Sequence, residues 1–313
     1  MLKIKVPATS ANLGPGYDSF GLALNLFNEY EFEIKKEVEK LSINIIDNKE
    51  KDINLKKEDN LILNTIKYLQ GKYPDKINTQ GLHIKAKINY PLNRGLGSSA
   101  NAIVGTIIGL NNLYSLGIDN KTILSSALDL EGHPDNIVPT LIGGFTISKV
   151  ENGKIIFEKF NVGKEIKILL FIPDLAIKTK DARRVVDKSV NIKNASQNIA
   201  NASLITAGLI NSNLGLIKKG SKDYIHQTKR LALNTKLENI FFDLQDRLNC
   251  PYFLSGSGST LIFLSKKDFR DEKEIINKMA VKFKIVNYLI ETEVNNKGII
   301  INKDGDKSVE RIN

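Results

Sequence analysis

The sequence predicts a globular protein built from both helices and strands, and three observations support this class. Its 313 residues fit one large domain or two of ordinary size. Apolar residues make up 42% of the chain and charged residues 26%, which is enough apolar material for a sizeable core. Segments with alternating apolar residues occur beside longer apolar segments without proline, so strands and helices are both expected.

Composition also indicates where the protein works. The apolar runs are far shorter than a membrane span and the mean hydropathy is -0.18, so we expect no membrane partner. The first residues, MLKIKVPATS, lack the apolar region and cleavage site of a signal peptide. Cys250 is the single cysteine, which excludes an internal disulfide and a cysteine-based zinc site. These features predict a cytoplasmic protein.

The net charge of +10 allows two functional interpretations, a nucleic-acid partner or an anionic ligand such as a nucleotide. The lysines are scattered, however, and are often interleaved with acidic residues, as in residues 31–40 and 49–59. A basic stripe with interleaved aromatic residues does not occur in the sequence. We therefore expect no nucleic-acid partner.

The first half of the chain contains most of the strand patterns. Period-two alternation predicts strands over residues 2–6, 29–36, 41–46, 82–90 and 145–150. Helix patterns cover residues 61–70, 102–114 and 122–130. A domain boundary is expected within residues 150–165, which gives predicted domains over 1–158 and 159–313.

The second half is richer in helix patterns. We expect helices over residues 179–184, 194–219, 224–230, 237–248 and 268–280. Strand patterns cover residues 167–172, 252–254, 261–264, 284–293 and 297–303. Arg183 and Arg184 are adjacent on one of these helices and point in different directions, so only one of them is expected to reach a site.

The stretch PLNRGLGSSAN, residues 91–101, joins a predicted strand to a predicted helix. Gly95 and Gly97 allow a tight turn and let a ligand approach the backbone. Ser98 and Ser99 follow where the helix begins, and free N–H groups at a helix start favour a phosphate. The alternative is an ordinary strand–turn–helix with a serine cap, because a short glycine loop is a weak signal by itself.

Three further loops carry polar groups. Residues 7–18, PATSANLGPGYD, offer the Asn12 amide and the Asp18 carboxylate, which can pair an amine or accept a proton; a structural turn is the alternative. Residues 131–136, EGHPDN, hold two carboxylates that could bind Mg²⁺ and substrate. Residues 254–260, LSGSGST, form either a hairpin turn or a second wall beside the glycine loop.

Taken together and in this order, the four loops resemble those of the GHMP small-molecule kinases, in the branch that acts on L-homoserine. The resemblance covers nearly the whole chain and implies an α+β fold of two domains. The first would be ribosomal protein S5 domain 2-like and the second ferredoxin-like. The implied reaction transfers the γ-phosphoryl group of ATP to the side-chain hydroxyl of L-homoserine, on the route to threonine, in a homodimer. A kinase of another small alcohol and a regulatory protein with a kinase-like fold are the alternatives.

The resemblance also implies the nucleotide and metal sites. Mg²⁺ would be bound by Ser99 and Glu131, with Asp129 as a possible substitute for Glu131. The ATP phosphates would be bound by backbone N–H groups of the glycine loop, which consists of Pro91, Leu92, Asn93, Arg94, Gly95, Leu96, Gly97, Ser98, Ser99, Ala100 and Asn101.

The amino-acid pocket implied by the resemblance consists of Asn12, Asp18, His133, Asn136, Arg183 and Arg230. Two arginines suit a carboxylate, because a guanidinium group binds it with two parallel hydrogen bonds. Asp18 is expected to pair the substrate ammonium, with general base as the alternative role. Asp18, Asn12 and Arg183 form the expected catalytic group. Ser259 stands where the family has proline in the last loop.

Overall fold

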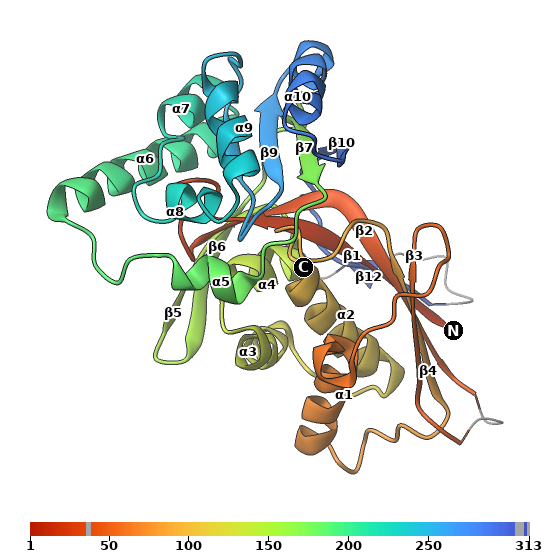
Figure 1. The fold of residues 1–313 in the computed structure, drawn as a ribbon. Helices are drawn as coiled ribbons and strands as arrows, with labels where there is room; N and C mark the ends of the chain where they lie inside the picture. The colour runs from red at the N-terminus through yellow and green to blue at the C-terminus, as the bar shows by residue number, and fades with distance from the viewer. Residues whose placement is uncertain (36–38, 304–309, 312–313) are drawn as a thin grey trace.

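The computed structural model describes residues 1–35, 39–303 and 310–311, and two β-sheets organise this part of the chain (Figure 1). The larger sheet has eight strands in the order β12-β11-β1-β2-β4-β3, with β5 paired to β2 and β6 paired to β5. Its pairs are antiparallel except β3 with β4. Its strands are β1 (Leu2–Ala11), β2 (Phe20–Ile34), β3 (Ser42–Asp47), β4 (Leu82–Ile88), β5 (Phe145–Glu151), β6 (Lys154–Phe160), β11 (Ile300–Lys303) and β12 (Glu310–Arg311).

Helices of the first half cover one face of this sheet. In Figure 1, α1, α2 and α3 lie below β1 and β2 of the larger sheet. Val6, Tyr30 and Phe32 on β1 and β2 share one buried core with Ile103 and Ile107 on α2. The covering elements are η1 (Lys57–Asp59), α1 (Leu61–Lys72), α2 (Ser98–Leu113), α3 (Asn120–Glu131) and α4 (Pro134–Ile142).

The smaller sheet has the order β10-β7-β9-β8, and all its pairs are antiparallel. This order, with α10 between β9 and β10, is the ferredoxin-like arrangement, so the predicted α+β fold class is confirmed. Its strands are β7 (Lys167–Pro173), β8 (Tyr252–Leu254), β9 (Leu261–Ser265) and β10 (Asn287–Glu293). The helices of this half are α5 (Thr179–Arg184), α6 (Ile192–Ile210), α7 (Leu214–Lys219), α8 (Gln227–Leu231), α9 (Thr235–Gln245) and α10 (Arg270–Lys282).

The two sheets face each other across a shared core. Along β7 the side chains alternate, so Ile168 and Leu170 pack with Leu22 and Leu24 of β2. Leu169 on the opposite face of β7 belongs to a third core with α9 and α10. The loops at one end of both sheets therefore meet, and the candidate site lies there. No helix in the described ranges is long and apolar enough to span a membrane.

The structure differs from the sequence expectation around residue 134. Residues 131–136 were expected to form one loop that ends near Pro139, whereas α4 begins at Pro134 and runs to Ile142. Proline suits the first turn of a helix, because the N–H that it lacks would have no partner there. Pro139 is tolerated inside α4, which is buried along nearly all of its length. Tertiary packing thus outweighs the helix-breaking tendency of Pro139.

The chain also divides differently from the expected boundary at 158/159. Residue 158 lies inside β6, which pairs with β5 along its whole length and was not expected as a strand. Near the other end, β11 returns to the larger sheet and pairs with β1, with Ile301 opposite Ile4. Strand β11 therefore belongs to the sheet of the first half although it lies after residue 159, and β12 pairs with it at the edge of that sheet.

Candidate active site

The glycine loop has the tight geometry that its sequence suggests. Gly95 and Gly97 both have positive φ, 76° and 66°, which favours glycine. A Cβ on Gly97 would lie 2.0 Å from Thr9 Oγ1, and a Cβ on Gly95 would lie 2.1 Å from the Ser255 carbonyl oxygen. Neither position has room for a side chain, so the backbone itself forms this wall of the site.

The helix start beside this loop has the geometry that favours an anion. Helix α2 begins at Ser98, directly after the left-handed Gly97, one helical turn earlier than expected. The first N–H groups of a helix have no intrahelical partner, and the helix dipole adds positive potential there. Ser98 and Ser99 line an open pocket, together with Asn93. This end of the pocket can bind a phosphate group.

Four members of the expected phosphate loop point elsewhere. Arg94 donates to the Asp174 carboxylate at 2.8 Å, so its side chain ties the loop to the end of β7. Leu96 and Ala100 are buried in the apolar cores. The Asn101 N–H donates to the Gly97 carbonyl, and its side-chain amide donates to backbone carbonyls of β1. These four residues therefore support the loop and do not line the pocket.

The loop between β8 and β9 packs against the glycine loop, as expected for a second wall. The Ser255 hydroxyl lies 2.6 Å from the Gly95 carbonyl and 2.8 Å from Ser10 Oγ. The Thr260 N–H donates to the Arg94 carbonyl at 3.1 Å. Gly256 in this loop lines the pocket.

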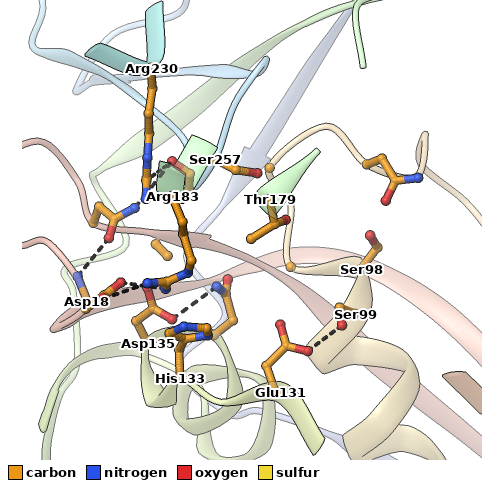
Figure 2. A pocket seen from close by; sticks show the side chains of 17 residues that line it. Asp18, Ser98, Ser99, Glu131, His133, Asp135, Thr179, Arg183, Arg230 and Ser257 are labelled. Carbon is orange, nitrogen blue, oxygen red and sulfur yellow. Dashed lines mark hydrogen bonds and ion pairs between the residues drawn. The ribbon is translucent and has the colours of Figure 1, made fainter. Parts of the chain in front are cut away.

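Glu131 lies beside Ser99 in the pocket (Figure 2). The Ser99 hydroxyl donates to the Glu131 carboxylate. Burial raises the pKa of Glu131 to about 7, because few groups around it compensate a negative charge. Asp129, the expected substitute, instead accepts hydrogen bonds from Tyr68 and Lys72 on α1. The hydroxyl and carboxylate oxygens of Ser99 and Glu131 are the ligand type that Mg²⁺ prefers.

Asp18 and Arg183 form a two-pronged ion pair in the pocket. Arg183 Nη1 and Nη2 donate to the two Asp18 oxygens at 3.0 and 2.8 Å. Burial opposes the charge of Arg183, but the hydrogen bonds and charge of Asp18 outweigh it and raise the Arg183 pKa. The neighbouring Arg184 is exposed, so one of the two adjacent arginines reaches the site, as expected.

Asn12 holds this part of the pocket in place. Its side-chain oxygen accepts the Asp18 N–H at 3.0 Å, and its amide donates to the Gly256 carbonyl at 3.3 Å. Both groups of the Asn12 side chain are therefore used within the chain. This arrangement favours a positioning role for Asn12 over the catalytic role expected from the resemblance.

Arg230 approaches the same region from α8, and Figure 2 shows it beside Arg183. Its side chain is 2% exposed and donates to the carbonyls of Gly256, at 2.8 Å, and Ala182, at 3.2 Å. Burial lowers its pKa. Within the described ranges, Arg230 has no ion pair with a carboxylate, so its charge is compensated only in part. A guanidinium group in this setting favours an anionic ligand.

The start of α4 adds three polar side chains. Asn136 accepts a hydrogen bond from Thr9 at 2.8 Å, and His133 stands directly before the helix. Burial and the charge of Arg183 lower the pKa of His133. Asp135 also lines the pocket, although the sequence analysis gave it no individual role. Burial, with the charge of Asp18, raises the pKa of Asp135 to about 7.

A second pocket adjoins the beginning of the glycine loop. Its walls are the turn after β3, the end of β4, Pro91 and Leu92, and Tyr288 of β10. Lys49 lies on its rim. Tyr90 also lines this pocket, while its hydroxyl is buried in the protein and, within the described part of the chain, has no hydrogen-bond partner. The sequence analysis missed this pocket because its residues come from separate segments without a shared motif.

The fold and the glycine loop place the protein among the small-molecule kinases of the GHMP class. Residues 60–144 match the family described as "GHMP kinases N terminal domain". The chain is 33% identical over 302 residues to the homoserine kinase of Halothermothrix orenii, covering 96% of both chains. It is 35% identical over 304 residues to that of Clostridium botulinum strain Langeland, covering 96% of this chain and 99% of the other.

A solved structure supports the fold at the level of the whole chain. The crystal structure of homoserine kinase from Cytophaga hutchinsonii is similar with a TM-score of 0.82, at 24% identity, covering 96% of this chain and 97% of the other. With the relatives above, these comparisons show that the chain belongs to the homoserine kinase family.

Proposed function

We propose that the protein transfers the γ-phosphoryl group of ATP to the side-chain hydroxyl of L-homoserine and releases O-phospho-L-homoserine. One observation carries this proposal. Arg183, Arg230 and Asp18 converge at one end of a pocket whose other end is the start of α2. Two cations and one anion suit the carboxylate and ammonium of an amino acid, and the helix start suits a phosphate.

The nucleotide would bind along the glycine loop. The triphosphate would lie against the N–H groups at Ser98 and Ser99, where the helix dipole is favourable. The second pocket continues from the start of this loop and can take the nucleoside. Apolar side chains such as Ile53 and Leu92, with the polar Asn48 and Asn89 beside them, suit a flat ring with polar edges.

Ser99 and Glu131 would hold Mg²⁺ beside the phosphates. Their oxygens supply one hydroxyl and one carboxylate, and Mg²⁺ in kinase sites completes its shell with phosphate oxygens and water. When bound, the ion neutralises negative charge on the phosphoryl oxygens. Without the ion, burial raises the pKa of Glu131 to about 7. A cation at this position would lower that pKa and favour the ionised carboxylate.

The amino acid would be oriented by the opposite end of the pocket. Its carboxylate would pair with Arg183 and Arg230, and its ammonium with Asp18. Asn12 fixes the Asp18 backbone, and Asn136 and His133 would direct the hydroxyl toward the phosphate end. Phosphoryl transfer depends on in-line positioning and charge neutralisation, and the pocket offers both.

Asp135 is the better acceptor for the proton that the hydroxyl loses. Asp18 is engaged by Arg183 through both oxygens and fits the charge-pairing role. Asp135 has a pKa of about 7, close to neutral pH, which suits proton transfer. The base role considered for Asp18 is therefore assigned to Asp135 in this proposal.

A coupled ADP-release assay with MgATP tests the proposed function. It compares L-homoserine with mevalonate, galactose and L-serine at equal concentrations. Turnover on L-homoserine alone is the expected result. Turnover on another alcohol would keep the roles of Ser99 and Glu131 but remove those of Arg183 and Arg230. Nucleotide binding without turnover on any alcohol would favour a regulatory protein.

The proposal extends to a homodimer, which rests on the resemblance alone. Light scattering coupled to size-exclusion chromatography measures it directly. The expected mass is twice that of the 34.9 kDa chain. A mass that stays at one chain across the working concentration range would contradict the dimer.

A further inference from the structure

Tyr17 lies behind the two arginines of the pocket, and the proposed function gives it no role. It belongs to the turn between β1 and β2, directly before Asp18. The centre of its ring lies 5.2 Å from Arg230 Cζ and 6.0 Å from Arg183 Cζ. Its hydroxyl oxygen lies 3.4 Å from Arg183 Nη1. One aromatic ring is therefore within interaction distance of both cations.

The arginine pair needs such a contact because two like charges repel each other in a site with little water. Arg183 is paired with the Asp18 carboxylate, whereas the hydrogen bonds of the buried Arg230 side chain, among the described residues, go to two backbone carbonyls. The negative face of an aromatic ring attracts a guanidinium group, and more strongly where water is excluded. Tyr17 thus adds attraction for both cations without adding a charge that would compete with a substrate carboxylate.

The second half of the chain holds this ring in place. The His226 ring packs against Tyr17 with 5.2 Å between centroids. His226 Nε2 lies 2.7 Å from the Gly14 carbonyl, and the Asn198 amide donates to the Pro15 carbonyl at 2.8 Å. Two buried side chains on different elements therefore fix the turn that carries Tyr17.

The ring beneath Tyr17 is also electrically neutral. Burial lowers the pKa of His226 to about 4, so the imidazole carries no charge at neutral pH. Because Nε2 contacts the Gly14 carbonyl oxygen, Nε2 carries the proton. A charged imidazole at this position would add a third positive charge below Arg183 and Arg230.

Building on the proposed function, we propose that Tyr17 is the positioning residue of the arginine pair. Its ring contacts both guanidinium groups from behind and directs them toward the place of the substrate carboxylate. The contribution comes from the ring face and only in small part from the hydroxyl. Tyr17 thereby raises affinity for L-homoserine and has no direct part in phosphoryl transfer.

The test compares Tyr17→Leu, Tyr17→Phe and the unchanged protein in the coupled assay with MgATP. For Tyr17→Leu we expect KM for L-homoserine to rise about tenfold, from loss of the cation–π contacts. kcat should stay within about twofold, because the reacting end of the pocket is unchanged. Tyr17→Phe keeps the ring and should restore KM to within about twofold of the unchanged protein. Tyr17→Met takes the place of Tyr17→Leu should the latter not fold.

Two controls separate positioning from general damage. KM for ATP should be the same in all variants, because the Tyr17 side chain contacts Arg183, Arg230 and His226, which lie outside the glycine loop. Tyr224→Leu removes a nearby ring that contacts Lys222 and not the arginine pair, and should leave KM for L-homoserine unchanged. Three results would overturn the proposal for Tyr17 while the enzyme activity stands. They are an unchanged KM for L-homoserine in Tyr17→Leu, a rise of this KM in Tyr17→Phe as large as in Tyr17→Leu, and a parallel rise in KM for ATP. Absence of L-homoserine turnover in the unchanged protein would overturn the proposed function, and the role of Tyr17 with it.

Discussion

Asp18 and Asp135 are neighbouring carboxylates whose surroundings give them different tasks. Asp18 has both oxygens on Arg183, so its charge is matched by a cation. Asp135 is 4% exposed and accepts a weak hydrogen bond from the Asn136 side chain at 3.3 Å. The pKa of Asp135 is raised to about 7 for this reason. Two separate predictions follow from the contrast, one for stability and one for substrate affinity.

Replacing Asp135 by Asn should stabilise the protein at pH 8. The carboxyl ionises near pH 4 in the unfolded chain and near pH 7 in the folded protein. The folded state therefore holds more protons between these values, so the free energy of unfolding falls as pH rises from about 4 to about 7, and the full penalty is present at pH 8. Asn removes the penalty, so the free energy of unfolding should rise by about 2 to 4 kcal/mol at pH 8 and change little at pH 4.

Urea unfolding at both pH values measures this difference. Asp129→Asn is the matched control, because the hydrogen bond from Tyr68 lowers the Asp129 pKa. That control should lose a little stability at pH 8 and gain none. Equal effects of the two substitutions would show that Asp135 is ionised without penalty. In the coupled assay Asp135→Asn should also reduce kcat, since it removes the proton acceptor.

Replacing Asp18 by Asn should raise KM for L-homoserine strongly and leave KM for ATP unchanged. The substitution keeps the shape of the side chain but removes the charge that would pair the substrate ammonium and that now pairs Arg183. Loss of one partner in a partly buried charge pair costs more than loss of a surface pair. Steady-state kinetics with each substrate varied in turn measure the effect. A large loss of kcat at unchanged KM would instead assign the base role to Asp18.

At the scale of single elements, Gly97 sets where α2 begins and therefore where the proposed phosphate site lies. Gly97 has a φ of 66°, and a Cβ there would meet Thr9 Oγ1 at 2.0 Å. Gly117, after the end of α2, has a similar φ of 71° but open space around it. Substituting each glycine by alanine therefore distinguishes the effect of backbone strain, which both positions share, from the effect of a steric contact, which occurs at Gly97.

Gly97→Ala should raise KM for ATP several-fold, because the added methyl pushes the loop away from Thr9 and displaces the start of α2. Gly117→Ala carries the same backbone strain, about 1 to 2 kcal/mol, and should leave KM for ATP unchanged. Thermal unfolding of both variants measures the stability lost to backbone strain. The coupled assay measures the change in KM for ATP. Equal KM values in the two variants would show that the loop tolerates a side chain at residue 97.

Most elements were predictable from sequence, and the exceptions share a physical cause. The pattern around residues 82–101 identified β4, the glycine loop and α2, because their periodicity and turn residues are local. Helix α4 was missed because a proline such as Pro139 usually indicates the end of a helix. Strand β6 was missed because most of its residues are exposed and give no alternating apolar pattern. The site residues with motifs were predicted by the resemblance. The Tyr17 ring lies within 6.0 Å of Arg183 and Arg230, and Asp135 lines the same pocket as both arginines. These neighbours are distant in sequence, so no local pattern marks them.

At the scale of the whole molecule, the two sheets form one structure and not two separable halves. They share the core between β2 and β7, and β11 adds the last part of the chain to the first sheet. Neither feature could be predicted from the sequence, because an alternating pattern indicates a strand but does not indicate which other strand pairs with it. The predicted domains over 1–158 and 159–313 assume that residues close in sequence belong to the same domain. The pairing of β11 with β1 instead joins segments that are far apart along the chain.

Ile299 allows a test of this unity. It is fully buried in the core beneath the larger sheet, although it lies close to the C-terminal end of the chain. Ile299→Ala should lower the free energy of unfolding by about 2 to 5 kcal/mol, from lost apolar contacts and the cavity left behind. Val286→Ala, at a side chain that is 70% exposed, should change it by less than about 0.5 kcal/mol.

Hydrogen exchange then shows how far the effect of Ile299→Ala travels. Because the sheets share a core, peptides from β1 and from β7 should lose protection by the same factor. The site lies between these sheets, so a cooperative molecule would lose L-homoserine binding and ATP binding at one urea concentration. Protection lost in β1 alone, with β7 unchanged, would show instead that the larger sheet unfolds by itself and that the pocket can lose its glycine loop while Arg183 and Arg230 stay in place.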